Sequence, residues 1–303
     1  MISIKDVKKK FTGAGGVDAL TGVTANVSDG SIFGLIGSNG SGKSTLMRIM
    51  CGIFRADSGD VLYDGVPIYE NYALKQRIVY LSDEQYFLPH ATLSDMRAFY
   101  RSAYDTFDDQ LYMKMTETFG LDRDRKINTF SKGMQKQSAL LLGLSVRPKY
   151  ILCDETFDGI DPVMRQIVRR MIADDVAESG LTAVISTHNL RELEDLTDHI
   201  CLLHRGAVML DRELDDMKLT IHKVQAVFDN DDAGAGALRA LDIVSHEAQG
   251  RLQTFVCRGS EEEINSALAA ASPIYSEIIP LTLEEIFISE MEGIGYDAKN
   301  IIQ

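Results

Sequence analysis

The segment Gly37-Ser38-Asn39-Gly40-Ser41-Gly42-Lys43-Ser44-Thr45 carries the clearest structural signal in this chain. An apolar run at residues 32–36 precedes it and is typical of a buried strand, and residues 46–51 follow it with helical spacing. A glycine-rich loop between a strand and a helix is the context in which the pattern G-x-x-x-x-G-K-[ST] holds phosphate. Glycines let successive N–H groups point inward, and the helix N-terminus adds partial positive charge. The sequence therefore predicts a nucleotide-binding loop.

The last three residues of this loop have specific expected roles. We expect Lys43 to reach the β- and γ-phosphates, Ser44 to bind Mg²⁺ and Thr45 to lie beside the α-phosphate. The remaining six residues of the loop are expected to bind the nucleotide through their backbone. The pattern thus predicts a polyphosphate with its metal ion, here ATP with Mg²⁺.

A second motif supplies carboxylates. Residues 150–153 form an apolar run that ends in Asp154 and Glu155. Enzymes with a phosphate loop hold Mg²⁺ by a carboxylate at the end of a neighbouring strand, which indicates that Asp154 is a metal ligand. Glu155 could then polarise the attacking water as general base. Two adjacent acids are common on surfaces, so the combination with Lys43 gives the motif its weight.

Composition limits the class of protein. The chain has 303 residues, 45% of them hydrophobic and 25% charged, and a formal net charge of −14. This acidic balance disfavours an extended grip on nucleic acid, so no nucleic-acid partner is expected. No apolar run approaches the roughly 18–20 residues of a membrane helix, and the N-terminus lacks the apolar core of a secretory signal. The four cysteines are isolated, which indicates free thiols in a cytosolic protein.

Short apolar runs alternate with helical patterns, which predicts a mostly parallel sheet flanked by helices. The expected strands are residues 32–36, 78–81, 150–153, 182–186 and 199–203. The central strands end in polar clusters. Because ligands of open α/β sheets bind at the carboxyl ends of the strands, we expect these clusters to meet at one site.

Residues 86–145 interrupt the strands and have a helical pattern. One helical face carries aromatic and methionine side chains at three- and four-residue spacing, namely Met96, Phe99, Tyr100, Tyr104 and Phe107. Two interpretations stay open: this face is the core of a small helical subdomain, or it belongs to a groove that receives another protein's helix.

The pattern changes again after residue 211, and we place a domain boundary near residue 215. The first domain is expected to span residues 1–214 and the second residues 215–303. In the second, residues 224–228 and 252–256 are typical of strands, and residues 261–271 and 283–291 of helices. Residues 234–237 would begin a helix or a loop.

Three further segments suggest a family. They are Thr156-Phe157-Asp158-Gly159-Ile160-Asp161-Pro162, Phe130-Ser131-Lys132-Gly133-Met134-Gln135-Lys136-Gln137 and Ile185-Ser186-Thr187-His188. Together with the first two motifs they resemble the ordered motif series of the ATP-binding cassette (ABC) family. The Ser-Lys-Gly-Met version is similar to ATPase subunits of bacterial ABC transporters whose membrane domains are separate chains. The resemblance covers residues 1 to about 210.

This resemblance implies an α/β fold of the P-loop ABC-ATPase type. It would combine a mostly parallel core sheet, an antiparallel β subdomain and the helical subdomain, followed by a small α+β C-terminal domain. The family resemblance also implies a two-fold dimer that encloses two ATP molecules. The partner in the dimer would be a second copy or a sister ATPase.

The resemblance assigns further site residues. Ser131 and Gly133 would close on the γ-phosphate held by the opposite subunit, and Asp161 would cross the dimer seam. His188 resembles the switch histidine that contacts the γ-phosphate and orients water. Phe11 resembles the aromatic that stacks on adenine, although simple packing is the alternative.

The chain departs from the family pattern at one metal-site position. Asp83 stands where a glutamine is usual, and Gln85 lies two residues further on. The family's glutamine helps to hold Mg²⁺ and links the site to the membrane partner. Asp83 could still reach the metal through water, and Gln85 is the other candidate. Lys132 and Met134 are variants familiar in the subgroup, and Thr156 replaces a proline.

The function implied is that of an ATP-binding and hydrolysing subunit that powers a membrane transporter. An integral-membrane permease would be its partner and would hold it on the inner face of the cell membrane. Two other functions are weighed against this one. The first is an ABC ATPase unconnected with transport, acting on ribosomes or DNA, and the second is a module that senses ATP without hydrolysing it.

Overall fold

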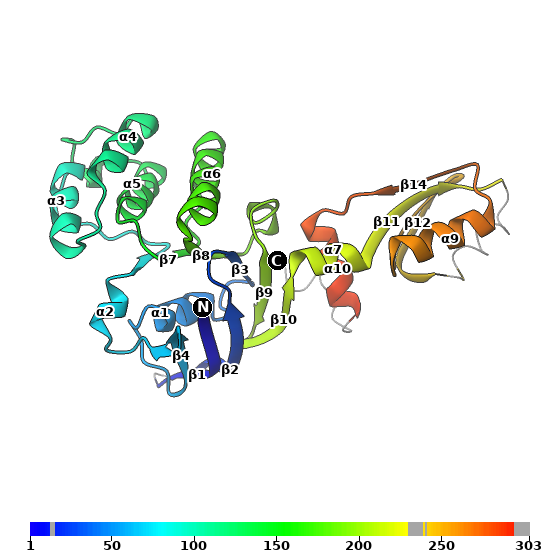
Figure 1. The fold of residues 1–303 in the computed structure, drawn as a ribbon, viewed down its shortest axis with the longest axis horizontal. Helices are drawn as coiled ribbons and strands as arrows, with labels where there is room; N and C mark the ends of the chain where they lie inside the picture. The colour runs from blue at the N-terminus through cyan, green and yellow to red at the C-terminus, as the bar shows by residue number, and fades with distance from the viewer. Residues whose placement is uncertain (13–15, 230–238, 240, 294–303) are drawn as a thin grey trace. The chain divides into compact units, whose positions relative to one another are not determined.

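A computed structural model describes all residues except 13–15, 230–238, 240 and 294–303 (Figure 1). The chain forms two compact units, Met1–Asp211 and Arg212–Gln303, and each is described here by itself. The expected domain boundary lay near residue 215.

The first unit is built around a six-stranded sheet with the order β10-β9-β3-β8-β7-β6. Strands β3, β8, β7, β6 and β9 pair in parallel wherever they are neighbours. Strands β3, β7 and β8 are buried along their whole length, which explains the apolar runs in β3 and β7. The bounds of the strands are β3 Ile32–Ile36, β6 Ile78–Leu81, β7 Tyr150–Asp154, β8 Thr182–Thr187, β9 His199–His204 and β10 Ala207–Glu213.

The bounds of β3, β6, β7, β8 and β9 match the strands expected from the sequence to within one residue, whereas β10 was not among those expected. The predicted mostly parallel core sheet is confirmed. Helix α1 (Lys43–Met50) follows β3 through the glycine-rich loop, and helix α6 (Pro162–Ser179) connects β7 to β8. The carboxyl ends of β3, β6, β7 and β8 therefore lie along one edge of the sheet.

A second sheet in this unit is antiparallel, with the order β2-β1-β4-β5. Its strands are β1 Ile2–Phe11, β2 Val17–Val27, β4 Ser58–Tyr63 and β5 Val66–Pro67. It shares one hydrophobic core with α1 and the parallel sheet, in which Ile4, Val23, Met47 and Leu152 are all buried. The sequence motifs implied this subdomain only through the family resemblance.

The helical subdomain contains α3 (Leu93–Ala103), α4 (Asp109–Phe119) and α5 (Lys132–Ser145), grouped away from β1 and β2 in Figure 1. Helix α5 packs against α3, α4 and β6, and so joins the subdomain to the parallel sheet. Side chains cap all three helices: Thr92 caps α3 in a capping box with Asp95, Asp108 caps α4, and Ser131 caps α5. The remaining short helices of the unit are α2 Tyr72–Lys75, η1 Ile127–Thr129 and η2 Leu190–Glu192.

The aromatic face expected here is only partly helical, because α3 ends at Ala103 and Tyr104 and Phe107 lie beyond it. Met96 is buried, Tyr100 and Tyr104 are half-buried with ring centroids 6.0 Å apart, and Phe99 is 48% exposed. Burial raises the pKa of the Tyr100 hydroxyl to about 12. Tyr100 and Tyr104 therefore pack against each other, and Phe99 remains accessible.

The second unit contains an antiparallel sheet with the order β12-β13-β11-β14. Strands β13 and β14 flank β11 and are connected through α9, which makes a split β-α-β arrangement of the ferredoxin-like type. Helix α9 packs Ile264 and Leu268 against Val224 and Phe255 in a core of its own. The bounds are α7 Leu214–Thr220, β11 Ile221–Val227, β12 Asp242–Gln249, β13 Leu252–Arg258, α9 Glu261–Ala271, β14 Tyr275–Ile279 and α10 Leu283–Gly293.

The expected α+β character of this unit is confirmed. Strands β12 and β14 were not foreseen from the sequence, because most of their residues are exposed and polar. The segment 234–237 lies outside the described residues. Among the helices that the structure describes, none has the length and apolar character needed to cross a membrane.

Candidate functional site

The glycine-rich loop joins the end of β3 to the start of α1. Gly40 and Gly42 have φ angles of +79° and +110°, which side-chain-bearing residues rarely adopt. At Gly42 an added Cβ would also lie 2.6 Å from the carbonyl oxygen of Ala19. The loop sequence therefore requires glycine for its conformation, and this conformation leads into the free N–H groups at the N-terminus of α1.

Lys43 is held inside this loop. Its side chain is 4% exposed, and its Nζ donates to the carbonyl oxygens of Gly37 at 2.7 Å and Ser38 at 3.3 Å. Nζ also lies 3.1 Å from Oε1 of Glu155. The Lys43 side chain thus extends across the loop, and its ammonium contacts Glu155 of the second motif. Phosphate oxygens of a bound nucleotide would compete with Glu155 for this ammonium.

Asp154, the last residue of β7, is 1% exposed and accepts three hydroxyl donors. Ser44 Oγ donates to Oδ1 at 3.2 Å and Ser186 Oγ to the same oxygen at 2.6 Å, while the Tyr80 hydroxyl donates to Oδ2 at 2.9 Å. Burial and the Asp154 carboxylate raise the pKa of Tyr80, which keeps the phenol protonated as a donor. Ser44 and Asp154 offer oxygen ligands of the kind that Mg²⁺ prefers, so this donor set fits the metal.

Sequence reasoning missed Ser186 and Tyr80. The parallel register places Ser186 directly opposite Asp154, and Tyr80 lies on β6, the other neighbour of β7. A signal was present in the sequence, because both are hydroxyl residues near the carboxyl ends of predicted strands. Only the strand order shows which carboxylate they contact.

Glu155 follows β7 in a left-handed backbone conformation with φ of 47°. Its Oε2 lies 3.0 Å from Nδ1 of His188, which follows β8, and its Oε1 contacts Lys43. Asp158 Oδ2 lies 3.8 Å from the same histidine nitrogen. The structure therefore brings together Lys43, Glu155 and His188, three residues from three separate motifs.

Asp83 and Gln85 differ in placement. Asp83 lines a cavity together with Glu155 and the glycine-rich loop, and its carboxylate forms an ion pair with Lys136 at 2.9 Å. Gln85 instead donates to the carbonyl oxygen of Ser82. A metal would compete with Lys136 for Asp83.

This cavity has a volume of about 620 Å³ and suits a nucleotide. Phe11 lies at its rim, 39% exposed, with its ring edge-on to Phe54 at 5.7 Å between centroids. The ring is thus both packed and accessible. The other lining residues are Val17, Ala19, Asn39, Gly40, Ser41, Gly42, Lys43, Ser44, Thr45, Asp83 and Glu155.

The residues assigned to the opposite subunit are at helix starts. Ser131 caps α5 by accepting from the Met134 N–H at 3.2 Å, and Asp161 caps α6 by accepting from the Val163 N–H at 2.9 Å. Gly133 lies so near the segment before α6 that an added Cβ would be 2.8 Å from the Gly159 carbonyl oxygen. None of these residues is in the lining of the cavity of its own chain.

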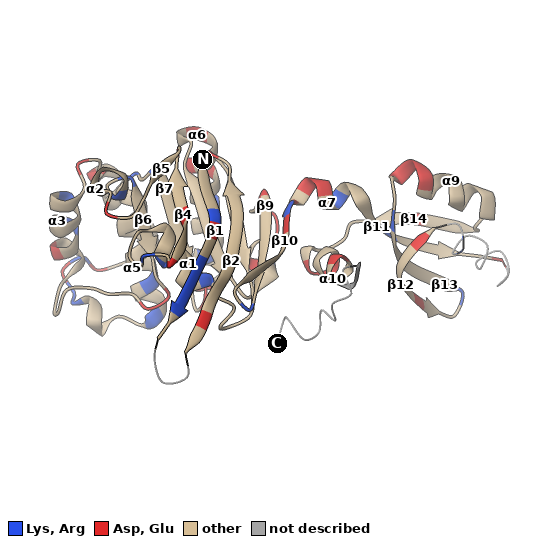
Figure 2. Cartoon of the chain, turned by 90° about the horizontal axis from the view of Figure 1, so that it is seen from below, with Lys and Arg blue, Asp and Glu red and all other residues tan. Residues whose placement is uncertain are grey.

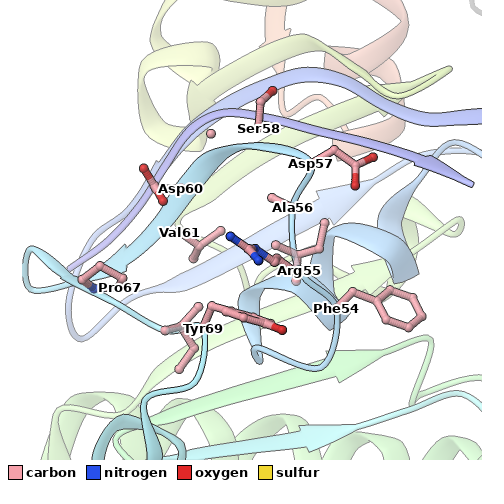
Figure 3. Close-up of a pocket in the computed structure, with 12 residues that line it drawn as sticks. Phe54, Arg55, Ala56, Asp57, Ser58, Asp60, Val61, Pro67 and Tyr69 are labelled. Carbon is pink, nitrogen blue, oxygen red and sulfur yellow. The ribbon is translucent and has the colours of Figure 1, made fainter.

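A second cavity of about 620 Å³ lies between the end of α1 and β4 (Figure 3). Arg55 extends over the ring of Tyr69 at 5.4 Å there, and Asp57 and Asp60 contribute carboxylates. Asp57 is engaged by Lys9 at 2.7 Å. The carboxylates of Asp57 and Asp60 would repel a triphosphate, so this cavity is a poor nucleotide site.

The charged residues in Figure 2 are intermingled, and basic residues gather along β1. Lys8, Lys9 and Lys10 of this strand each pair with an aspartate, within 3.4 Å, 2.7 Å and 3.1 Å respectively.

The four cysteines are free and buried, and burial raises the pKa of the Cys153 thiol to about 12.

Comparisons with a protein-family model and with known proteins agree with a nucleotide-binding function for this site. The family model described as ABC transporter matches residues 20–158. The chain is 32% identical over 293 residues to the ABC transporter ATP-binding protein YtrB of Bacillus subtilis (strain 168), covering 97% of this chain and 99% of that protein.

Solved structures share the fold. The dimeric ATP-binding cassette MJ0796, in a post-hydrolysis state with ADP and phosphate, has a TM-score of 0.64 at 22% identity and covers 71% of this chain and 99% of that one. Another is cbiO1 from Clostridium perfringens, described as part of the ABC transporter complex cbiONQ, with a TM-score of 0.58 at 22% identity over 71% of this chain and 89% of that one.

Proposed function

The chain belongs to the ABC transporter family of ATP-binding proteins, and we propose that its cavity binds ATP with Mg²⁺ between Phe11, the glycine-rich loop and the end of β7. The chain is thus an ATP-hydrolysing subunit of a transporter. The observation that carries the proposal is the convergence of Lys43, Asp154, Glu155 and His188 at one edge of the sheet. Ser44 and Asp154 would hold Mg²⁺, which neutralises charge on the β- and γ-phosphates.

Hydrolysis in this site rests on positioning and charge neutralisation. Lys43 leaves Glu155 for the β- and γ-phosphates, which frees the Glu155 carboxylate to accept a proton from the attacking water. His188, whose Nδ1 lies 3.0 Å from Oε2 of Glu155, would contact the γ-phosphate and orient the attacking water. Ser131 and Gly133 of a second subunit close on the γ-phosphate, and its loss reopens the dimer.

Glu155→Gln tests the assignment of the base. The amide cannot take a proton, so we expect the turnover number for phosphate release from MgATP to fall by about a hundredfold or more while ATP binding persists. Phosphate release by the full chain and ATP affinity at equilibrium are the measurements, and ATP-dependent dimer accumulation is followed by light scattering.

Glu117→Gln is the matched control, because Glu117 is exposed on α4. It should behave like the wild type. Near-normal turnover in Glu155→Gln would remove Glu155 as the base, and ATP binding without any phosphate release by the wild type would indicate a sensing module.

We also propose that a membrane permease binds the helical subdomain and holds this chain at the inner face of the membrane. The support is a set of exposed apolar side chains: Tyr86 is 80% exposed, Leu88 40% and Phe99 48%. Co-purification with the membrane protein is the measurement, and Phe99→Ala should weaken it without lowering basal hydrolysis. Unchanged co-purification would exclude Phe99 from the contact.

A further inference from the structure

Lys136 makes two polar contacts that the proposed catalytic roles leave unused. It lies on α5, its side chain is 12% exposed, and its Nζ donates to Oδ1 of Asp83 and to the backbone carbonyl oxygen of Glu155, each at 2.9 Å. An ammonium with so little access to water requires such partners, because desolvation of a charge is costly. The side chain is therefore held in one place by the helical subdomain, the segment after β6 and the end of β7.

Glu155 needs support from its surroundings. Its left-handed conformation, with φ of 47°, is unfavourable for a residue with a side chain. Its N–H lies within hydrogen-bonding distance of the Ser186 carbonyl oxygen at 3.1 Å and of Ser186 Oγ at 3.2 Å, and its carbonyl accepts from Lys136. These contacts hold the two peptide planes that flank the Glu155 Cα. The direction in which the carboxylate leaves the backbone follows from those two planes.

We propose that Lys136 is a positioning residue: its bond to the Glu155 carbonyl oxygen aims the Glu155 carboxylate at Lys43 and His188. The inference rests on the proposed role of Glu155 as base. Asp83 neutralises the ammonium but does not contact Glu155 through any bond that the structure shows among the described residues. The contact with Glu155, and not the ion pair, carries the effect on hydrolysis.

Lys136→Met removes the ammonium and keeps most of the side chain. The turnover number for MgATP hydrolysis by the full chain should fall about ten- to a hundredfold, as for a lost hydrogen bond to a charged donor, and KM should stay within about twofold. Lys136→Arg, whose guanidinium can donate to both acceptors, should recover most of the loss. Lys114→Met, at an exposed position on α4, is the matched control and should equal the wild type.

Asp83→Ala separates the two contacts of Lys136. It leaves the bond to the Glu155 carbonyl oxygen in place, so its turnover should fall less than that of Lys136→Met. Equal losses in Asp83→Ala and Lys136→Met would overturn the inference in favour of the ion pair.

Thermal unfolding and equilibrium ATP affinity distinguish a positioning role from a general loss of structure. Lys136→Met should keep both close to the wild type, and a parallel fall in both with turnover would overturn the inference. Wild-type turnover in Lys136→Met would also overturn it and leave the proposed function intact. An inactive wild-type chain would remove the proposed function and this inference together.

Discussion

At the scale of single residues, the Asp154 carboxylate shows how the site is prepared for a cation. A carboxylate that is 1% exposed must have hydrogen-bond donors to offset its lost hydration. Ser44, Ser186 and Tyr80 supply three neutral donors and no ammonium. No ion pair to Asp154 is found in the part of the chain that the structure describes, so its negative charge is oriented by neutral donors, which suits a carboxylate proposed to bind Mg²⁺.

Tyr80→Phe tests this preparation. The variant leaves Oδ2 of Asp154 without its phenol donor, and loss of such an outer partner typically weakens metal binding by about tenfold or more. The Mg²⁺ concentration that gives half-maximal ATP hydrolysis should rise accordingly. Tyr72→Phe, at a 75% exposed side chain, is the control. An unchanged Mg²⁺ dependence in Tyr80→Phe would separate Tyr80 from the metal site.

At the scale of elements, a buried acid joins α6 to the segment that follows β8. Glu192 in η2 is 2% exposed, accepts from the Thr187 hydroxyl at 2.8 Å and lies 3.5 Å from Nη1 of Arg165 on α6. Burial raises the pKa of Glu192 above its ordinary value, with Asp158 adding to the shift and Thr187 and Arg165 opposing it. The link spans the segments that carry Asp161 and His188.

Replacing Glu192 with Gln should change how the free energy of unfolding depends on pH. Because the pKa of Glu192 is raised in the folded chain, the folded state keeps a proton that the unfolded state loses as pH rises above about 4.5. Wild-type stability relative to the variant should therefore decline as pH rises from about 4 through the raised pKa and then level off. Urea unfolding across this range measures the difference.

Glu178→Gln, exposed on the same helix α6, provides the comparison for that experiment. The difference in stability between Glu178→Gln and the wild type should change less with pH than the difference for Glu192→Gln. If wild-type stability relative to Glu192→Gln instead increased as pH rises, this would contradict the assigned direction of the pKa shift.

At the scale of the whole molecule, each of the two units has a hydrophobic core among the described residues. One core joins α1, the parallel sheet and the antiparallel sheet, and the other joins α9 to its own sheet. The proposed nucleotide site lies entirely within the first unit. We propose that the second unit is an accessory domain with a regulatory role.

Phe255→Ala should separate the two cores experimentally. Phe255 is fully buried beside Val224 and Ile264, and truncation of a buried phenylalanine costs about 3–5 kcal/mol. The second unit should unfold at a lower temperature, while MgATP should still raise the transition of the first unit. Scanning calorimetry with and without MgATP measures both. A single transition that responds to both changes would contradict independent cores.

Prediction from sequence succeeded where one local pattern is sufficient. The buried parallel strands, such as β3 and β7, have unbroken apolar runs that end in polar residues, so their bounds could be predicted closely. Strands β12 and β14 lack such runs, because much of each strand is exposed and their place depends on pairing with β13 and β11. Their existence is a property of the sheet as a whole.

The sequence by itself determined the phosphate-binding loop, the two acids at the end of β7 and the order of the motifs, because each depends on residues that are neighbours in the chain. Only the tertiary structure decided that Ser186 and Tyr80 meet on Asp154 and that Lys136 reaches the Glu155 carbonyl oxygen. Those contacts join residues up to 74 positions apart. They depend on strand register and helix packing, which no local pattern encodes.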